Sequence, residues 1–304
     1  MHQKMITPPE LKRGDTIGIV STARWMKPED LNPFLKKAEE AGLRVELGPN
    51  LFQQHHQLAG TDSQRRADLQ RMLDNPVIRA VICARGGYGT VRIIDSIRLD
   101  GLRVSPKWVV GYSDVTVLLA HLFRNGFESI HGPMPISLLQ EQDPKNIDLL
   151  FKVLFGEGVN YTVSEAHSLN RPGTGQGKVI GGNLSLLQTL IGTSTDPLTD
   201  GCILFLEDLD EYLYHVDRMM MHLKRAGKLT RLAGLVVGGF TQMKDNTVPF
   251  GQSAYEIIAE TVREYSYPVV FGFPCGHQAR NYPLIVGRTA RLEVTPGGPS
   301  TLRY

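Results

Sequence analysis

The sequence has little net charge and no long apolar run. Its 33 lysine and arginine residues stand against 31 aspartate and glutamate residues, which leaves a formal net charge of +2. Proteins that bind nucleic acid or anionic membranes usually carry a basic patch, so we expect neither partner. No window approaches the roughly 18 apolar residues that a membrane helix needs, and residues 1–15 lack the apolar stretch of a secretion signal. We therefore expect a soluble, cytoplasmic protein.

Cysteine is also scarce. The three cysteines, Cys83, Cys202 and Cys275, lie far apart in the chain. A disulfide framework uses an even number of cysteines at recurring spacings, and a zinc site usually uses close pairs, so the sequence predicts neither. The apolar neighbours of Cys83 and Cys202 indicate small buried side chains, and the absence of paired cysteines suits a reducing compartment.

The first half of the chain alternates short apolar runs with amphipathic segments. Residues 16–20, 43–47, 79–84 and 107–111 have the length and composition of strands, and helical patterns follow them. Strands that alternate with helices predict βαβ units. The sequence therefore predicts an α/β fold with a mostly parallel sheet flanked by helices.

The pattern changes after this first half. Residues 156–178 contain five glycines, one proline and many small polar residues, which is typical of a linker. A chain of 304 residues has the length of about two domains. We predict an N-terminal α/β domain over residues 1–160, a linker over 161–178, and a smaller mixed α/β domain over 179–304 with a β-rich tail.

The segment VVGYSDVT at residues 109–116 places Ser113 between an apolar strand and a helix. A serine at such a turn exposes its hydroxyl, and the helix N-terminus behind it supplies unbonded N–H groups. This geometry suits a nucleophile beside an oxyanion hole. Val115 replaces the second glycine of the hydrolase elbow G-x-S-x-G. Ser113 or Asp114 could equally cap the helix, and the local sequence does not decide.

A glycine-rich loop, ARGGYG at residues 84–89, also follows a predicted strand. Such a loop can bring backbone N–H groups close to an anion. It lacks the lysine of a P-loop and the full G-x-G-x-x-G spacing, so the evidence for a nucleotide site is weak. Two roles for this loop remain open: an ordinary tight turn, or a source of N–H groups that bind an oxyanion.

Two segments of the second half carry groups suited to acid–base chemistry. LEDLDE at residues 206–211 places Glu207 at the end of an apolar strand, beside further carboxylates. These side chains could orient a histidine, bind a metal ion or cap a helix. His277 lies in a loop bounded by glycine and proline after a predicted strand, where catalytic groups of α/β proteins collect. A lone histidine is more often structural, so its spacing alone does not select it.

Taken together, these segments resemble the LD-carboxypeptidase family in order and approximate spacing. The family is also called the muramoyltetrapeptide carboxypeptidases and includes the microcin-immunity peptidases. The resemblance covers nearly the whole chain, although no single motif is specific. The motifs that carry it are ARGGYG (84–89), VGYSD (110–114), HGPM (131–134), GGNLSLL (181–187), LEDLDEYLYHVDRMM (206–220) and GFPCGH (272–277).

The resemblance implies a serine peptidase in which Ser113 is the nucleophile and Glu207 and His277 complete the triad. It implies that the first domain carries the serine and the second the glutamate and histidine, so that the active site lies between them. Backbone N–H groups of Gly87 and Asp114 are the implied oxyanion hole. The resemblance also implies a homodimer without a metal ion, and we expect no cofactor. The implied reaction releases the terminal D-alanine from muropeptide tetrapeptides during peptidoglycan recycling.

The substrate contacts are less defined by the sequence. A carboxypeptidase needs a cation for the terminal carboxylate, and Arg85 and Arg280 are candidates. Tyr88 and His131 are further candidates for the cleft. The chain departs from the family at residues 20–24, where VSTAR replaces a common A-P-S turn, so the rim of the cleft is expected to differ.

Three alternatives remain open. A microcin-immunity peptidase would act on a peptidyl nucleotide, although LEDLDE resembles the cell-wall recycling branch more closely. A non-catalytic protein could close two domains on a small ligand with the same loops. A metal-dependent hydrolase could use the carboxylates of residues 207–211.

Overall fold

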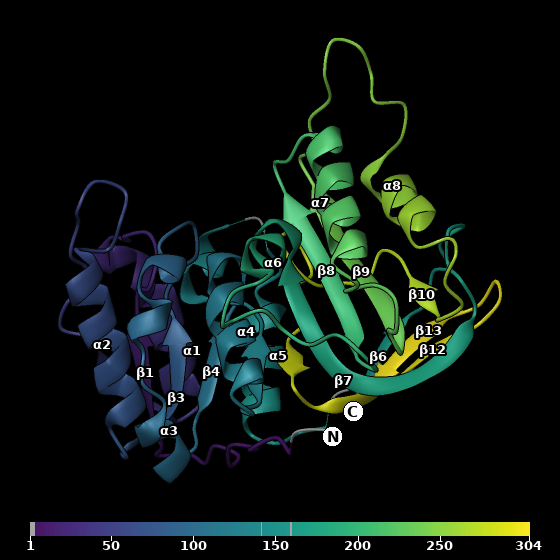
Figure 1. The fold of residues 1–304 in the computed structure, drawn as a ribbon. Helices are drawn as coiled ribbons and strands as arrows, with labels where there is room; N and C mark the ends of the chain where they lie inside the picture. Colours follow the sequence, from purple (N-terminus) through teal and green to yellow (C-terminus); the bar gives the residue numbers. More distant parts are fainter. Residues whose placement is uncertain (1–3, 141, 159) are drawn as a thin grey trace.

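The structure, a computed structural model, describes residues 4–140, 142–158 and 160–304. Two β-sheets stand side by side, each with helices packed against it (Figure 1). The expected α/β fold, with a mostly parallel first sheet, is confirmed. No helix within these ranges is long and apolar enough to cross a bilayer.

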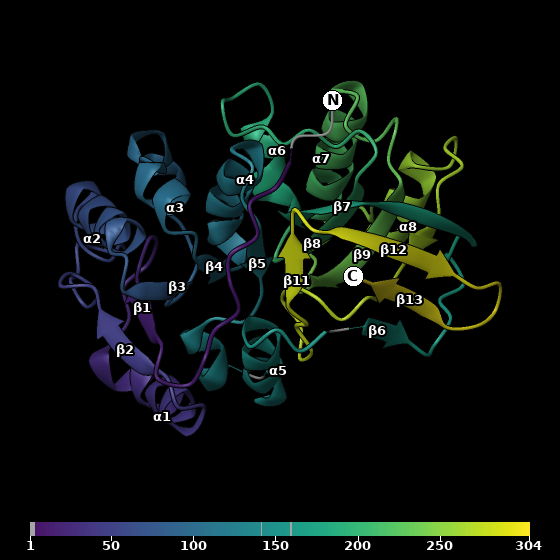
Figure 2. The ribbon, with the colours of Figure 1, turned by 90° about the horizontal axis from the view of Figure 1, so that it is seen from below.

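The first sheet has six strands in the order β11-β5-β4-β3-β1-β2, and β1 to β5 run parallel. Runs of Ile, Val and Ala make β3 and β4 apolar on both faces, as a parallel sheet covered on both sides requires. Helices α2, α3 and α4 cover one face, and α1 and α5 cover the other (Figure 2). The elements are β1 (Thr16–Val20), α1 (Asn32–Glu40), β2 (Arg44–Leu47), α2 (Asp62–Asp74), β3 (Ile78–Cys83), α3 (Asp100–Val104), β4 (Trp108–Gly111), α4 (Thr116–Arg124), β5 (Ser129–His131), α5 (Lys145–Leu154) and β11 (Leu284–Val286).

The second sheet has seven strands in the order β10-β9-β8-β7-β12-β13-β6. Strands β7 to β10 run parallel, and β12, β13 and β6 add an antiparallel side. The elements are β6 (Asn160–Val163), β7 (Gly173–Asn183), α6 (Leu184–Leu190), β8 (Ile203–Leu209), α7 (Leu213–Arg225), β9 (Gly234–Thr241), α8 (Ala254–Thr261), β10 (Val269–Val270), β12 (Thr289–Val294) and β13 (Ser300–Arg303). Short 3-10 helices lie at Pro28–Leu31, Thr90–Arg92, Ile94–Ser96, Ser113–Val115 and Pro135–Leu139.

Half of the segment predicted as a linker, residues 161–178, is strand. It contains most of β6 and the first half of β7. Two of the glycines that suggested a loop serve close packing instead: a Cβ on Gly175 would collide with the carbonyl of Ala233, and one on Gly177 with the carbonyl of Gly201. Their composition therefore reflects the approach of a neighbouring backbone.

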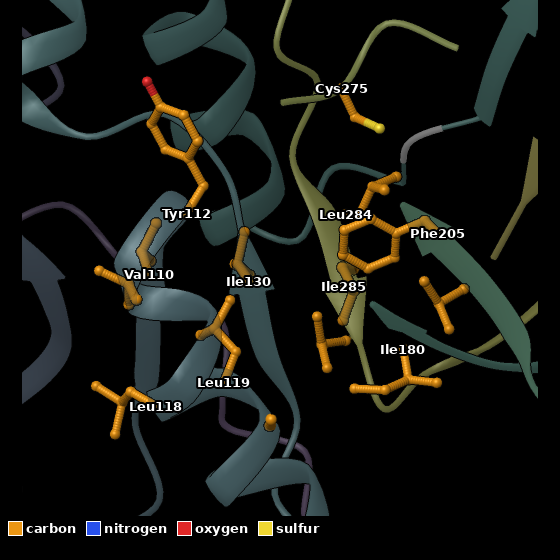
Figure 3. Close-up of a cluster of buried hydrophobic side chains, with 14 of the residues drawn as sticks. Val110, Tyr112, Leu118, Leu119, Ile130, Ile180, Phe205, Cys275, Leu284 and Ile285 are labelled. Carbon is orange, nitrogen blue, oxygen red and sulfur yellow. The ribbon is translucent and has the colours of Figure 1, made fainter. Parts of the chain in front are cut away.

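The two sheets share one hydrophobic core. Strand β11 lies late in the sequence, yet it pairs antiparallel with β5 at the edge of the first sheet, between the two sheets (Figure 2). Its Leu284 and Ile285 belong to one cluster of buried side chains with Ile130 of the first sheet and Phe205 of the second (Figure 3). This continuous packing fixes the relative position of the sheets and brings the ends of β4 and β8 to one cavity.

Candidate active site

Ser113 occupies a sharp turn between β4 and the 3-10 helix Ser113–Val115, which continues into α4. Its φ is 62°, in the left-handed region that residues other than glycine rarely adopt. Such a conformation costs about 1–3 kcal/mol and is found where the surroundings impose it, commonly at functional sites. Neither Ser113 nor Asp114 caps the helix through its side chain. Within the described part of the chain the hydroxyl has no hydrogen-bond partner, and it faces a cavity.

Glu207 and His277 form a buried pair at the ends of the second sheet. Glu207 lies in the last part of β8 and is fully buried, whereas the side chain of His277, in the loop after β10, is 15% exposed. The Nδ1 of His277 lies 2.6 Å from Glu207 Oε2, and its backbone N–H donates to the same oxygen at 3.1 Å. Gly276 allows this approach: its φ is 90°, and a Cβ there would collide with the side chain of Glu207. Position 276, directly before the histidine, therefore requires glycine for steric reasons.

The two groups shift each other's pKa. Burial alone would lower the pKa of His277, but the charge of Glu207, the hydrogen bond to it and the nearby Asp208 outweigh burial, so the pKa is raised. For Glu207, burial would raise the pKa, and the charge and hydrogen bonds of His277 outweigh it, so that pKa is lowered. A carboxylate bonded to Nδ1–H leaves Nε2 as the basic nitrogen of the neutral ring.

One cavity of about 390 Å³ is lined by both Ser113 and His277. The ring of Tyr112, the residue before the serine, lies 4.9 Å from the ring of His277, centroid to centroid. No hydrogen bond joins Ser113 to His277 in the described structure; catalytic hydrogen bonds are often long in unliganded enzymes and tighten when substrate binds. The two halves are joined nearby, because Asn183 N–H donates to Thr116 Oγ1 of α4 at 3.1 Å.

The glycine loop lies against the turn that carries Ser113. A Cβ on Gly86 would lie 3.0 Å from Ser113 Oγ and 3.5 Å from the backbone N of Asp114, so the glycine loop packs directly on this turn. The N–H of Asp114 lies in a first helical turn, where no intrahelical acceptor exists. The N–H of Gly87 has no acceptor among the described residues. The carboxylate of Asp114 points elsewhere and accepts the N–H of Thr90 at 2.8 Å.

The predicted substrate contacts lie in different places. Arg85 lines the cavity, and its Nη1 donates to the carbonyl of Trp25 at 2.9 Å. Arg280 instead lines a separate cavity between α5 and β6, and Tyr88 is exposed outside the catalytic cavity. His131 points into the core, where burial lowers its pKa to about 4. These last three residues therefore do not line the catalytic cavity, because their loops and strand direct them elsewhere.

The carboxylates of residues 207–211 do not converge on a common point. No three metal-ligating side chains among the described residues are placed to share an ion. Burial, followed by the charge of Glu207, raises the pKa of Asp208 to about 7. Each carboxylate engages its own partner: Glu207 bonds His277, Asp208 bonds Asn183, Asp210 pairs with Lys244, and Glu211 bonds His215.

A strained serine at a strand–helix turn, in one cavity with a histidine bonded to a buried glutamate, has the composition of a serine hydrolase site. Two family models match the chain: the LD-carboxypeptidase N-terminal domain over residues 17–132, and the LD-carboxypeptidase C-terminal domain over residues 176–292. The chain therefore belongs to the LD-carboxypeptidase family and is a serine-type carboxypeptidase. The family resemblance expected from the motifs is confirmed.

Individual relatives agree with this assignment. The chain is 36% identical to a probable murein peptide carboxypeptidase of Bacillus subtilis, over 94% of this chain and 91% of the relative. It is 26% identical to the microcin self-immunity protein MccF of Escherichia coli, over 91% of this chain and 89% of MccF. The crystal structure of muramoyltetrapeptide carboxypeptidase from Oxalobacter formigenes superposes with a TM-score of 0.85 at 28% identity, covering 94% of this chain and 97% of that one.

Proposed function

We propose that this protein cleaves the L,D-bond that holds the terminal D-alanine of murein tetrapeptides, with Ser113, His277 and Glu207 as its triad. The observation that carries this proposal is the shared cavity of Ser113 and His277, with the histidine held by the buried Glu207 at 2.6 Å. The strained backbone of Ser113 supports it, because strain of this kind is retained where function requires it.

The proposed reaction is acyl transfer in two steps. Ser113 Oγ attacks the carbonyl carbon of the residue before D-alanine, while His277 Nε2 takes the hydroxyl proton and Glu207 stabilises the imidazolium. The N–H groups of Gly87 and Asp114 bind the oxyanion. The C–N bond then breaks, and His277 gives its proton to the leaving amine of D-alanine. In the second step water attacks the acyl-enzyme, with His277 again as base, and restores Ser113.

The lining of the cavity favours a peptide over a peptidyl nucleotide. Among the described lining residues, the only Phe, Tyr or Trp is Tyr112, which is buried and packs against His277. A nucleobase would thus find no exposed aromatic ring on which to stack. The names of the Bacillus subtilis and Oxalobacter formigenes proteins, which refer to murein peptide and muramoyltetrapeptide, support the same substrate class.

Release of D-alanine tests the proposal directly. Purified protein incubated with a disaccharide-free tetrapeptide is expected to yield D-alanine and the tripeptide in equal amounts, measured by mass spectrometry. A serine-directed covalent probe is expected to label Ser113. A protein that neither releases D-alanine nor reacts with the probe would be a two-domain binding protein instead.

The acid limb of the pH profile should report His277. Only the neutral imidazole can accept the serine proton, and the pKa of His277 is raised above its ordinary value by Glu207 against the effect of burial. Activity is therefore expected to be low in acid and to rise with pH through this raised pKa, above the midpoint of an unperturbed histidine. The measurement is kcat/KM of the tetrapeptide across pH. A limb centred at or below the ordinary histidine value would contradict the assignment.

We also propose that the protein is a cytoplasmic homodimer without a cofactor. The family resemblance supports the dimer and the lack of a metal ion, and the three scattered cysteines suit a reducing compartment. We propose a division into an N-terminal domain over residues 1–160 and a C-terminal domain over residues 179–304. Residues 161–178 between them contribute to strands β6 and β7 of the second sheet, and β11 crosses to the first sheet. Light scattering on the purified protein measures its oligomeric state, and a monomer at working concentration would contradict the dimer.

A further inference from the structure

An arginine that the motifs did not single out lies beside the nucleophile. Arg24 follows β1 and lines the catalytic cavity with Ser113. Strands β1, β3 and β4 are neighbours in a parallel sheet, so the loops at their carboxyl ends lie side by side, where α/β sheets bind ligands. These three loops carry Arg24, the glycine loop and Ser113 respectively.

Arg24 and Ser113 pack against adjacent glycines of the loop at residues 84–89. The aliphatic stem of Arg24 lies on Gly87, where a Cβ would come within 2.5 Å of Arg24 Cδ and 2.6 Å of Cγ. Gly86, the residue before it, packs against Ser113, with 3.0 Å between a Cβ placed there and Oγ. Adjacent Cα atoms are about 3.8 Å apart. The terminal carboxylate of a carboxypeptidase substrate likewise lies one residue beyond the carbonyl that the serine attacks.

The guanidinium of Arg24 is available to a ligand. Its side chain is exposed and makes no hydrogen bond or ion pair with any residue that the structure describes. Arg85, the other arginine lining the cavity, is partly buried and already bonds the carbonyl of Trp25. A guanidinium presents paired N–H donors that match a carboxylate. Arg24 is therefore better placed than Arg85 to accept a new anionic partner.

Acidic side chains from the second sheet also line the cavity. Asp208, Asp210 and Glu211, at and after the end of β8, line it together with the two arginines. Asp210 is paired with Lys244 and the pKa of Asp208 is raised to about 7, but none of these three side chains attracts a terminal carboxylate as an unpaired guanidinium does. The C-terminus of a peptide is therefore attracted to the arginines rather than to the end of β8.

We propose that Arg24 binds the C-terminal carboxylate of the peptide and thereby restricts this site to the last peptide bond. The inference rests on the proposed function, because it assumes that Ser113 attacks a peptide carbonyl. Arg24 thus takes the place of Arg280, which lies in another cavity, as the proposed cation for the substrate carboxylate. Residues 20–24, where the chain departs from the family's usual turn, acquire a role in substrate recognition.

The test compares a tetrapeptide with its C-terminal amide. The wild type is expected to favour the free acid, and Arg24→Gln is expected to lower kcat/KM for the acid by about 10- to 100-fold, the value of a charge-assisted hydrogen bond. It should leave kcat/KM for the amide nearly unchanged. Arg24→Lys, which keeps the charge without the paired donors, should retain part of the preference. The matched control is Arg66→Gln, an exposed arginine of α2 outside the cavity.

The outcomes separate this inference from the proposed function. If the wild type releases D-alanine and Arg24→Gln keeps the same acid-to-amide ratio, or loses both substrates equally, the role of Arg24 is refuted and the reaction stands. If the wild type releases no D-alanine, the proposed function fails. Calorimetry with the Ser113→Ala variant then decides about Arg24: acid-selective binding that Arg24→Gln abolishes supports it, and equal binding of acid and amide overturns it.

Discussion

Ser113→Ala is expected to lower kcat for tetrapeptide hydrolysis by about 10³-fold or more. The substitution removes the only atom that can form the acyl-enzyme in the proposed reaction, while the oxyanion-binding N–H groups and the cavity remain. Alanine also carries a Cβ, so the backbone at φ 62° is no more strained than with serine. The expected variant is therefore folded, binds the peptide and does not turn it over. Steady-state kinetics and circular dichroism of the same preparation measure both properties.

A control and a second substitution sharpen this prediction. Ser96→Ala, an exposed serine outside the cavity, should keep wild-type kcat, whereas near-wild-type turnover by Ser113→Ala would end the nucleophile assignment. Ser113→Gly should be equally inactive, yet its free energy of unfolding should be at least as large as that of the wild type. Relief of left-handed strain contributes about 1–2 kcal/mol, and the extra freedom of glycine in the unfolded chain costs about 0.5–1 kcal/mol. A less stable glycine variant would show that the turn is not strained.

Apolar patterning was sufficient to predict the parallel half of the fold. The runs at residues 16–20 and 107–111 coincide closely with β1 and β4, because strands buried on both faces leave an unbroken apolar signal. The same reasoning did not predict the strands within residues 161–178. Gly175 and Gly177 leave room for the neighbouring carbonyls of Ala233 and Gly201. A contact between distant segments leaves no pattern in the local sequence. Pairing of β11 with the first sheet is hidden for the same reason.

The candidate site shows a similar division. The order of the motifs predicts Ser113 and His277 as catalytic residues, and the structure brings both to one cavity. Local sequence could not exclude helix capping by Ser113, which the φ of 62° and the missing cap bond now argue against. The arginine that binds the substrate carboxylate is harder to predict, because the cavity that an arginine lines depends on the path of its loop. Arg280 lies three residues after His277 and faces another cavity, whereas Arg24 is far away in sequence and lines this one.

Glu207→Gln is expected to lower kcat by about 10³- to 10⁴-fold, as loss of the orienting carboxylate does in a serine triad. The amide has nearly the same shape, but it can donate a hydrogen bond to Nδ1 and so favour the tautomer whose Nε2 carries the proton. The pKa of His277 should also fall, because the charge and hydrogen bond of Glu207 are what raise it against burial. The acid limb of the residual activity is therefore expected to move to lower pH.

This pH shift distinguishes an orienting carboxylate from a merely structural one. Glu128→Gln is the matched control, since Glu128 is also buried, at 6% exposure, but bonds Arg288 away from the cavity. It should reduce stability while leaving kcat and the acid limb in place. Chelators should affect neither wild type nor variants. Activity that a chelator abolished and a divalent ion restored would instead make the carboxylates at the end of β8 a metal site. In that case the 2.6 Å contact with Glu207 would orient His277 as a metal ligand rather than as a base.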